Sequence, residues 1–478
     1  MAESVIIRWW RNVGARYLPF ADVGTAEVPL SRLWRLSLFQ VTVGMVQTLF
    51  VGTLNRVMIL ELRVPATLVA VGLAIPLLIA PFRALIGFRS DTYRCVLGWR
   101  RVPFIWFGTL MQFGGLAIMP FALLVLAPDA ATTARWIGYA GTALAFFLVG
   151  AGAHTTQTAG LALASDIAPE GRRPRVVALM YLTLLVGTVL SAFVLGRLLH
   201  SFSPIRLIQV IQGAAVVTML LNTIALWKQE ARQRGVVPYA KHERRPMFGE
   251  AWRVFTEGGR AVRLLVAVGL GFFAFNMQDV LLEPYGGEIL HLSVGETTGL
   301  TGIMALGAIL AFGVAARSLE RGTDPLRLAA SGALVGIMAF AAVIFASPLE
   351  SAALFRAGTL LIGAGEGLFG VGTLSAAMAL KDARAHGIAL GAWGAVFATA
   401  EGLALALSGV IRDGVAHLVA RGALGPGLSV PSVPYSVVYH LEIAALFATL
   451  IALGPLVAAS RGTTAVDGAR LGLADLPA

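Results

Sequence analysis

The chain has 478 residues, of which 57% are hydrophobic and only 13% are charged. Soluble domains carry about twice this share of charged residues, so the composition excludes a soluble globular protein as well as a disordered chain. The net charge of +11 does not indicate nucleic-acid binding. The basic residues lie in short segments between long apolar runs, as the orientation of a helical membrane protein requires.

Residues 1–33 contain no apolar segment of the kind that a signal peptide needs. Val5, Trp9, Val13 and Tyr17 instead share one helical arc, a pattern that predicts an amphipathic helix at the membrane interface. We therefore expect residues 1–33 to form a cytoplasmic or interfacial arm.

Twelve apolar windows follow, and each approaches or exceeds the roughly 20 residues that a transmembrane helix needs. They cover residues 34–60, 65–87, 102–127, 136–164, 175–199, 206–228, 263–285, 296–317, 327–346, 352–380, 387–411 and 435–459. The longest polar stretch between them, residues 229–262, separates the sixth window from the seventh. The sequence thus predicts an all-α polytopic membrane protein with two six-helix halves, 34–228 and 263–459, and a tail at 460–478.

Most of the 37 Lys and Arg residues lie in the arm, the central loop, the tail and the loops on the same side. Because basic residues concentrate in cytoplasmic loops, both termini and the central loop are predicted to be cytoplasmic. Twelve spans in this arrangement resemble the major facilitator superfamily, whose two halves are structural repeats.

Two polar residues of the fourth predicted span, His154 and Gln157, are one turn apart and share a helix face. Two interpretations stay open. A neutral imidazole can bind the magnesium of a chlorin while the Gln amide binds a ring carbonyl. Alternatively, the two side chains form interhelical hydrogen bonds that fix packing.

The seventh predicted span contains Asn276, Gln278, Asp279 and Glu283. Such residues inside a membrane are costly and are usually functional. The two acids are four residues apart, which predicts either a proton or cation site or an ion pair with Arg56 of the first span.

Single acids occur in the tenth and eleventh predicted spans, at Glu366 and Glu401. We expect each to be protonated in the low dielectric, or to pair with Arg83 or another helix.

The loop between the second and third spans has the elements of the gating loop of this superfamily. A glycine there lets helices approach, an aspartate caps or pairs across the halves, and basic residues anchor the cytoplasmic face. The spacing from the aspartate to the second glycine is wider than in ordinary transporters. The residues are Gly87, Arg89, Asp91, Gly98, Arg100 and Arg101.

Several stretches together resemble the PucC/LhaA family, the bacteriochlorophyll-delivery branch of the superfamily. They are LSRLWRLSLFQVTVGM (30–45), GTLNRVMILEL (52–62), APFRALIGFRSDTYR (80–94), LGWRRVPFIWFGTL (97–110), GAGAHTTQTAGLALASD (150–166), FNMQDVLLEPYGGEIL (275–290) and ALGAWGAVFATAEGLALALSGVIRD (389–413). The resemblance covers roughly residues 20–460, and the combination is more specific than any one stretch.

The resemblance implies an assembly factor for purple-bacterial light-harvesting complexes, with the core antenna slightly favoured. Such proteins are thought to bind bacteriochlorophyll, receive it from bacteriochlorophyll synthase and present it to antenna polypeptides at the reaction-centre complex, in the intracytoplasmic photosynthetic membrane. For this chain, His154, Gln157, Asn276, Gln278 and Asp279 are the residues expected at the pigment.

No catalytic residue or metal site is predicted, because the Asp-rich magnesium–diphosphate motifs of prenyl transfer do not occur in the sequence. Two other functions stay open. The intramembrane acids favour a proton-coupled transporter of a small solute, although fold alone is a weak argument for function. A scaffold that binds antenna subunits, but no pigment, is the third interpretation.

Overall fold

The structure is a computed structural model that describes residues 28–77, 86, 90, 99–127, 135–168, 173–230, 259–379 and 386–461. Within these ranges all regular structure is helical. The first half contains α2 (Leu30–Leu36), α3 (Leu38–Leu49), η2 (Phe50–Leu54), η3 (Val57–Glu61), α4 (Ala66–Ala74), α6 (Val102–Leu126), α7 (Arg135–Ile167), α8 (Arg173–Leu198) and α9 (Pro204–Leu226). The second half contains α11 (Arg260–Asn276), η7 (Met277–Val280), α12 (Leu282–Glu288), α13 (Val294–Glu320), α14 (Pro325–Ala346), α15 (Ala352–Met378), α16 (His386–Ala420), η8 (Pro426–Leu428) and α17 (Val433–Arg461).

Eleven helical segments of the described chain are long and apolar enough to cross a membrane. A twelfth, Ala66–Leu77, is shorter and sits where the second span is predicted; residues 78–85 lie outside the described part. The prediction of an all-α polytopic membrane protein is therefore confirmed.

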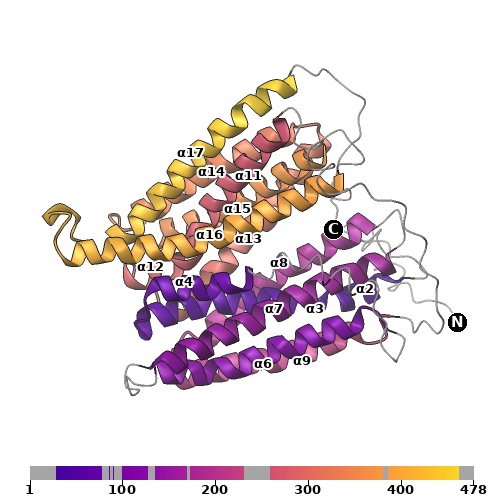
Figure 1. The fold of residues 1–478 in the computed structure, drawn as a ribbon, viewed down its shortest axis with the longest axis horizontal. Helices are drawn as coiled ribbons and strands as arrows, with labels where there is room; N and C mark the ends of the chain where they lie inside the picture. Colours follow the sequence, from indigo (N-terminus) through magenta and orange to yellow (C-terminus); the bar gives the residue numbers. More distant parts are fainter. Residues whose placement is uncertain are drawn as a thin grey trace, which may run out of the picture.

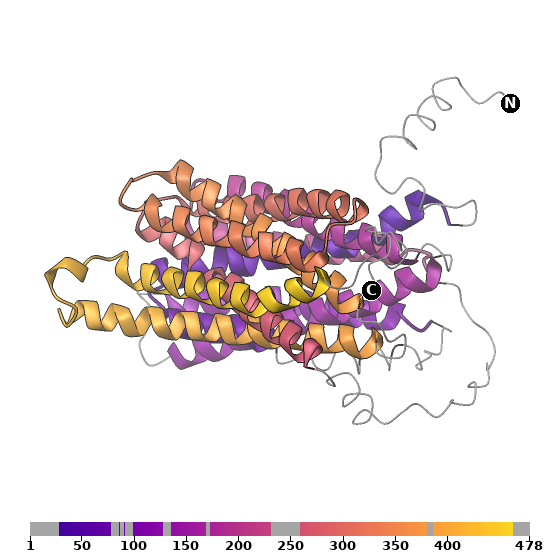
Figure 2. The same cartoon turned by 90° about the horizontal axis from the view of Figure 1, so that it is seen from above.

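The helices form two bundles, one from α2 to α9 and one from α11 to α17 (Figures 1 and 2). Between the bundles, α8 packs against α13 and α4 against α16. In Figure 1 the bundles meet where α4 and α12 lie and diverge toward the end where α2 lies. The end of the molecule where the bundles meet contains η3, α12 and the N terminus of α4. We call it the joined end.

Glycines allow the two bundles to approach closely in this region. A Cβ atom on Gly295 of α13 would lie 2.3 Å from the carbonyl oxygen of Gly196 of α8, and a Cβ atom on Gly52 of η2 would lie 2.3 Å from the Thr301 hydroxyl. Neither position has room for a methyl group, so the contact depends on glycine.

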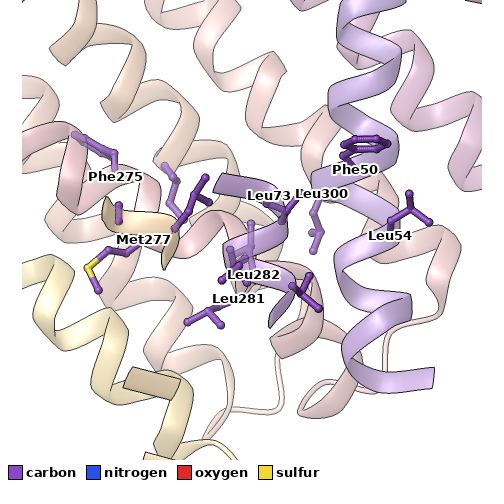
Figure 3. Close-up of a cluster of buried hydrophobic side chains, with 14 of the residues drawn as sticks. Phe50, Leu54, Leu73, Phe275, Met277, Leu281, Leu282 and Leu300 are labelled. Carbon is purple, nitrogen blue, oxygen red and sulfur yellow. The ribbon is translucent and has the colours of Figure 1, made fainter. Parts of the chain in front are cut away.

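One hydrophobic core continues across the boundary between the halves. Phe50 and Leu54 from the first span lie near Leu300 of α13, with Leu281 and Leu282 beside them (Figure 3). These side chains are at most 5% exposed, so the joined end is densely packed as well as polar.

The seventh span is interrupted, whereas the sequence predicts one continuous helix over 263–285. It consists of α11, the 3₁₀ segment η7 and the short helix α12. Pro284 follows the break and has no N–H to donate to the carbonyl of Val280. That carbonyl therefore needs a donor from elsewhere.

Candidate functional site

Asn55 of the first half supplies that donor across the boundary between the halves. Its Nδ2 donates to the carbonyl oxygens of Asp279, at 3.1 Å, and Val280, at 3.4 Å, and it lies 3.5 Å from Oε2 of Glu283. The side chain of Asn55 is fully buried. One amide of the first half therefore satisfies the broken backbone of the seventh span.

Two threonines of α13 complete this polar contact. The Thr301 hydroxyl donates to Oε1 of Glu283 at 3.1 Å, and the hydroxyls of Thr53 and Thr298 lie 3.0 Å apart. Glu283, which is 1% exposed, is thus hydrogen-bonded from both halves. Its role here is to join them.

The ion pair considered for Arg56 with Asp279 or Glu283 is wrong. Arg56 pairs with Glu61 at 2.9 Å and donates to the carbonyl of Leu292 at 3.3 Å. Glu61 is five residues further along, and the π-helical turns η2 and η3 bring residues with this spacing together.

A second inter-half contact caps helix α4. The helix begins after Pro65 without a side-chain cap of its own. Asp413 of α16 accepts both the backbone N–H and the hydroxyl of Thr67, each at 2.8 Å. The neighbouring Arg412 pairs with Glu288 at 3.1 Å. The joined end is therefore held by a cap from the opposite half.

The remaining acids gather inside the second half. Asp279 accepts a hydrogen bond from Gln278 and lies within electrostatic range of Glu366, Glu401 and Glu283. Asp279, Glu366 and Glu401 are partly exposed, although they lie in the middle of apolar helices. The three expected intramembrane acids are thus grouped around Asp279.

The other polar residues of the seventh span already have partners, Asn276 on its own helix and Gln278 on α13. Asn276 donates to the carbonyl of Phe272 at 2.6 Å, and Gln278 also lies 3.6 Å from the sulfur of Met304. The Oε1 atom of Gln278 is buried without a hydrogen-bond partner.

His154 and Gln157 lie on α7 in the first half, and both are partly exposed. Gln157 donates to Oε1 of Gln40 on α3 at 3.4 Å, so this side chain takes part in an interhelical contact. The five residues expected at the pigment therefore come from opposite halves.

The second half contains an aromatic cluster on α11 and α16. Phe272 of α11 contacts Trp393 and Phe397 of α16, with ring centroids 5.5 and 4.6 Å apart. The rings of Trp393 and Phe397 are stacked at 5.7 Å and are both partly exposed. They present a flat apolar surface.

Of the gating-loop residues, Gly87, Arg89, Asp91 and Gly98 lie outside the described part of the chain. Arg100 and Arg101 are described, and each pairs with Asp166 of α7 at 3.1 Å.

Glu230 accepts the backbone N–H groups of Arg100 and Val102, at 2.8 and 3.0 Å. The basic residues that follow this loop therefore anchor the start of α6 within the first half.

The sequence analysis missed the acid of the last span, Glu442 of α17. Its side chain is fully buried, and neither carboxyl oxygen has a hydrogen-bond partner among the residues that the structure describes. Tyr439, three residues earlier on the same helix face, is also fully buried, and its hydroxyl has no partner. The signal was present, because Glu442 is the one charged residue within the predicted span 435–459.

Comparison with known proteins places these features in a family. The PUCC protein family matches residues 53–461. The chain is 52% identical to an uncharacterized protein of the puhA–bchM intergenic region of Rhodobacter capsulatus, covering 98% of both chains. It is 54% identical to Protein PucC of Rhodovulum sulfidophilum, covering 84% of this chain and 90% of that one. A Rhodobacter capsulatus protein named bacteriochlorophyll synthase 44.5 kDa chain is 30% identical, covering 81% of this chain and 88% of that one.

Solved transporter structures share the fold at low sequence identity. An inward-facing, occupied bacterial homologue of the lysosomal transporter Spinster has a TM-score of 0.65 at 15% identity, covering 90% of this chain and 96% of that one. An inward-facing bacterial homologue of the iron transporter ferroportin has a TM-score of 0.62 at 14% identity, covering 89% and 98%. The predicted major facilitator fold is confirmed.

Proposed function

Because the chain belongs to the PUCC protein family, we propose that it is an assembly factor for purple-bacterial light-harvesting complexes that binds bacteriochlorophyll and delivers it to antenna polypeptides. The observation that carries this proposal is similarity to PucC proteins over nearly the whole chain, at 52–54% identity. The role is non-enzymatic and is exercised in the bacterial inner membrane, with both termini in the cytoplasm.

Bacteriochlorophyll is a flat apolar cargo whose magnesium takes a neutral nitrogen ligand. The partly exposed imidazole of His154 suits that ligand role. Gln157, three residues further along α7, donates to Oε1 of Gln40 at 3.4 Å, and its amide carries the N–H donors that contact with a ring carbonyl needs. These observations support the two residues as the polar end of a pigment site.

The second half offers complementary chemistry. The stacked rings of Trp393 and Phe397 are partly exposed and suit contact with a planar macrocycle. Asn276 donates to its own helix, and Gln278 contacts Met304 of α13. We therefore assign polar contact with the cargo on this side mainly to Asp279, which is partly exposed.

Hand-over of such a cargo requires direct contact with donor and acceptor, because the pigment is too apolar to cross water. We propose antenna polypeptides and the reaction-centre complex as acceptors, and bacteriochlorophyll synthase as the donor. The name of the relative that is 30% identical, bacteriochlorophyll synthase 44.5 kDa chain, supports a donor of this kind.

A complementation experiment tests this function. A strain that lacks the gene receives the wild-type chain, the double variant His154→Leu/Gln157→Met, or the control His440→Leu, whose side chain is exposed on α17. We expect the wild type and the control to restore the near-infrared antenna absorption of isolated membranes, and the double variant to restore much less. Full restoration by the double variant would contradict the assignment of a pigment site to His154 and Gln157 on α7. Failure of the wild-type chain would contradict the assembly role itself.

Proton-coupled transport of a small solute is the second candidate, favoured by the transporter fold and the acids around Asp279. Uptake into proteoliposomes that requires both a pH gradient and Asp279 would support it. Absence of uptake for tetrapyrrole precursors would favour the assembly factor.

A further inference from the structure

The last span carries a carboxyl group that neither its packing nor the proposed pigment site explains. Glu442 of α17 is 0% exposed, and both of its oxygens lack a hydrogen-bond partner. An unpaired carboxylate in an apolar interior loses its hydration without compensation, which is among the most expensive arrangements in a membrane protein. The residue therefore needs a ligand that removes its charge.

Two neutral polar groups, one on α17 and one on η7, are also unsatisfied. The Tyr439 hydroxyl lies one turn away on α17 and within electrostatic range of Glu442, and it has no partner. Oε1 of Gln278 is likewise buried and unpaired, while the same amide donates to Asp279, which is within electrostatic range of Glu442. Two segments, η7 and α17, thus carry the unsatisfied polar groups and the two acids Asp279 and Glu442, which are within electrostatic range of each other.

The titratable neighbours of this region supply no counter-charge. They comprise acids from η7, α12, α15 and α16 and the tyrosines of α12 and α17: Asp279, Glu283, Glu366, Glu401, Tyr285, Tyr435 and Tyr439. None of these side chains is basic, and Arg412, which donates to the Tyr435 hydroxyl at 3.1 Å, is already paired with Glu288 and Asp413. Within the described part of the chain, Glu442 therefore has no counter-charge from these groups.

We propose that Glu442 is a proton-binding site of the second half, occupied by a proton in the conformation described here. In the binding step, one oxygen of the carboxylate forms an O–H bond with a proton from a hydronium ion, whose own O–H bond breaks to leave a water molecule. The carboxylic acid then offers one donor and one acceptor to its neighbours.

The acids around Asp279 give this proton a route of exchange. Glu366, Glu401 and Asp279 are partly exposed, whereas Glu442 is fully buried. Asp279 is within electrostatic range of the partly exposed Glu366 and Glu401 and also of the buried Glu442. A graded series of carboxyl groups of this kind is typical of proton relays in membranes.

The site is also connected to the joined end. The carbonyl of Asp279 accepts the Asn55 amide of the other half at 3.1 Å, while its carboxyl group lies near Glu442. Separation of the halves would displace η7 and change the surroundings of Glu442. Protonation of Glu442 is thereby linked to the contact between the halves.

A proton fits the site better than a metal ion. In the described part of the chain no group of three acidic, His or Cys side chains is placed to hold a metal. A monovalent cation such as sodium is the competing ligand, and the experiment separates the two.

Infrared difference spectroscopy of the full chain in lipid nanodiscs tests the proposal at neutral pH. The spectrum of Glu442→Gln is subtracted from that of the wild type. We expect loss of one carbonyl band of a protonated carboxylic acid per chain, and this band should shift in D₂O. Loss of carboxylate bands in its place would overturn the proposal.

Glu61→Gln is the matched control, because Glu61 is exposed and is paired with Arg56 at 2.9 Å. It should lose carboxylate bands and leave the protonated band intact. Glu442→Asp guards against misfolding of the Gln variant, since it keeps the carboxyl group and should shift the protonated band rather than remove it. An unshifted band would contradict the assignment to Glu442.

The measurement is repeated with sodium replaced by N-methylglucamine. We expect the same protonated band in both salts. A band that is present only without sodium would show that sodium binds the carboxylate of Glu442. That result would overturn the proposed proton site in favour of a sodium site. All of these outcomes are independent of pigment binding.

Discussion

The two six-helix halves share one architecture but bury different polar chemistry. In the first half, Asn222 accepts from Thr42 at 3.0 Å and donates to Thr109 at 2.9 Å, so neutral groups satisfy one another across three helices. In the second half, Asp279 and Glu442 are acids within apolar spans, and Glu442 has no hydrogen-bond partner among the described residues. Satisfied neutral networks fix packing, whereas unsatisfied acids are retained for a function.

The boundary between the halves combines both kinds of contact. Asn55, a neutral amide of the first half, completes the broken backbone of η7 in the second half. We infer from this difference that the first half contributes fixed hydrogen bonds, whereas the second half contributes the acids that can change protonation state.

The largest effect is expected for Gly295→Ala, which places a methyl group against the backbone of Gly196. We expect a loss of about 1–3 kcal/mol in the free energy of unfolding, from overpacking at the α8–α13 contact. Unfolding in mixed detergent micelles measures it. Gly299→Ala is the matched control, because a Cβ atom at Gly299 one turn later has nothing within 4 Å. Equal stability of the two variants would contradict close packing of the halves.

Asn55→Ala tests the polar part of the same boundary. It leaves the buried carbonyls of Asp279 and Val280 without their donor, and we expect a loss of about 1–3 kcal/mol. Asn55→Asp cannot donate and should not rescue the loss. Wild-type stability of Asn55→Ala in the same unfolding assay would show that the carbonyls find another donor.

Asp413→Ala removes the cap that α16 provides for α4. Because the contact is only partly buried, the expected loss in the free energy of unfolding is smaller, about 0.5–2 kcal/mol. Asp413→Asn can still accept the N–H of Thr67 and should recover most of it. Amide hydrogen exchange at the start of α4 provides the measurement, and unchanged protection in the Ala variant would argue against a cap from the other half.

The smallest effect is expected for Glu442→Gln, because no hydrogen bond is lost. Its free energy of unfolding should change by less than about 1 kcal/mol, whereas Asn222→Ala should cost about 1–3 kcal/mol through the loss of two bonds. The free energies of unfolding of the two variants, measured in the same assay, test whether the buried polar groups of the two halves differ in their contribution to stability. A larger loss for Glu442→Gln would indicate a hydrogen-bonded carboxylate.

The sequence predicted the spans well because long apolar runs are a local signal. Interhelical contacts are not local, and the errors concentrate there. The pairing of Arg56 with Glu61 depends on π-helical turns that periodicity does not reveal, and the break at η7 was indicated only by Pro284.

The candidate site shows the same limit. The acids at Asp279, Glu366 and Glu401 were visible as charges in apolar runs, but their grouping needs the packing of η7, α15 and α16. Glu442 carried the same local signal and was overlooked. Only burial and the missing hydrogen-bond partner distinguish it from an acid at a helix end.

The most direct test of the central claim is an absorption spectrum of the chain purified in mild detergent from a pigment-making cell, with mass spectrometry of the associated molecules. The account predicts a near-infrared bacteriochlorophyll band together with antenna peptides or the synthase. A colourless protein with antenna subunits attached would contradict pigment handling and indicate a scaffold. A colourless protein alone would contradict the assembly role and favour transport through the acids around Asp279.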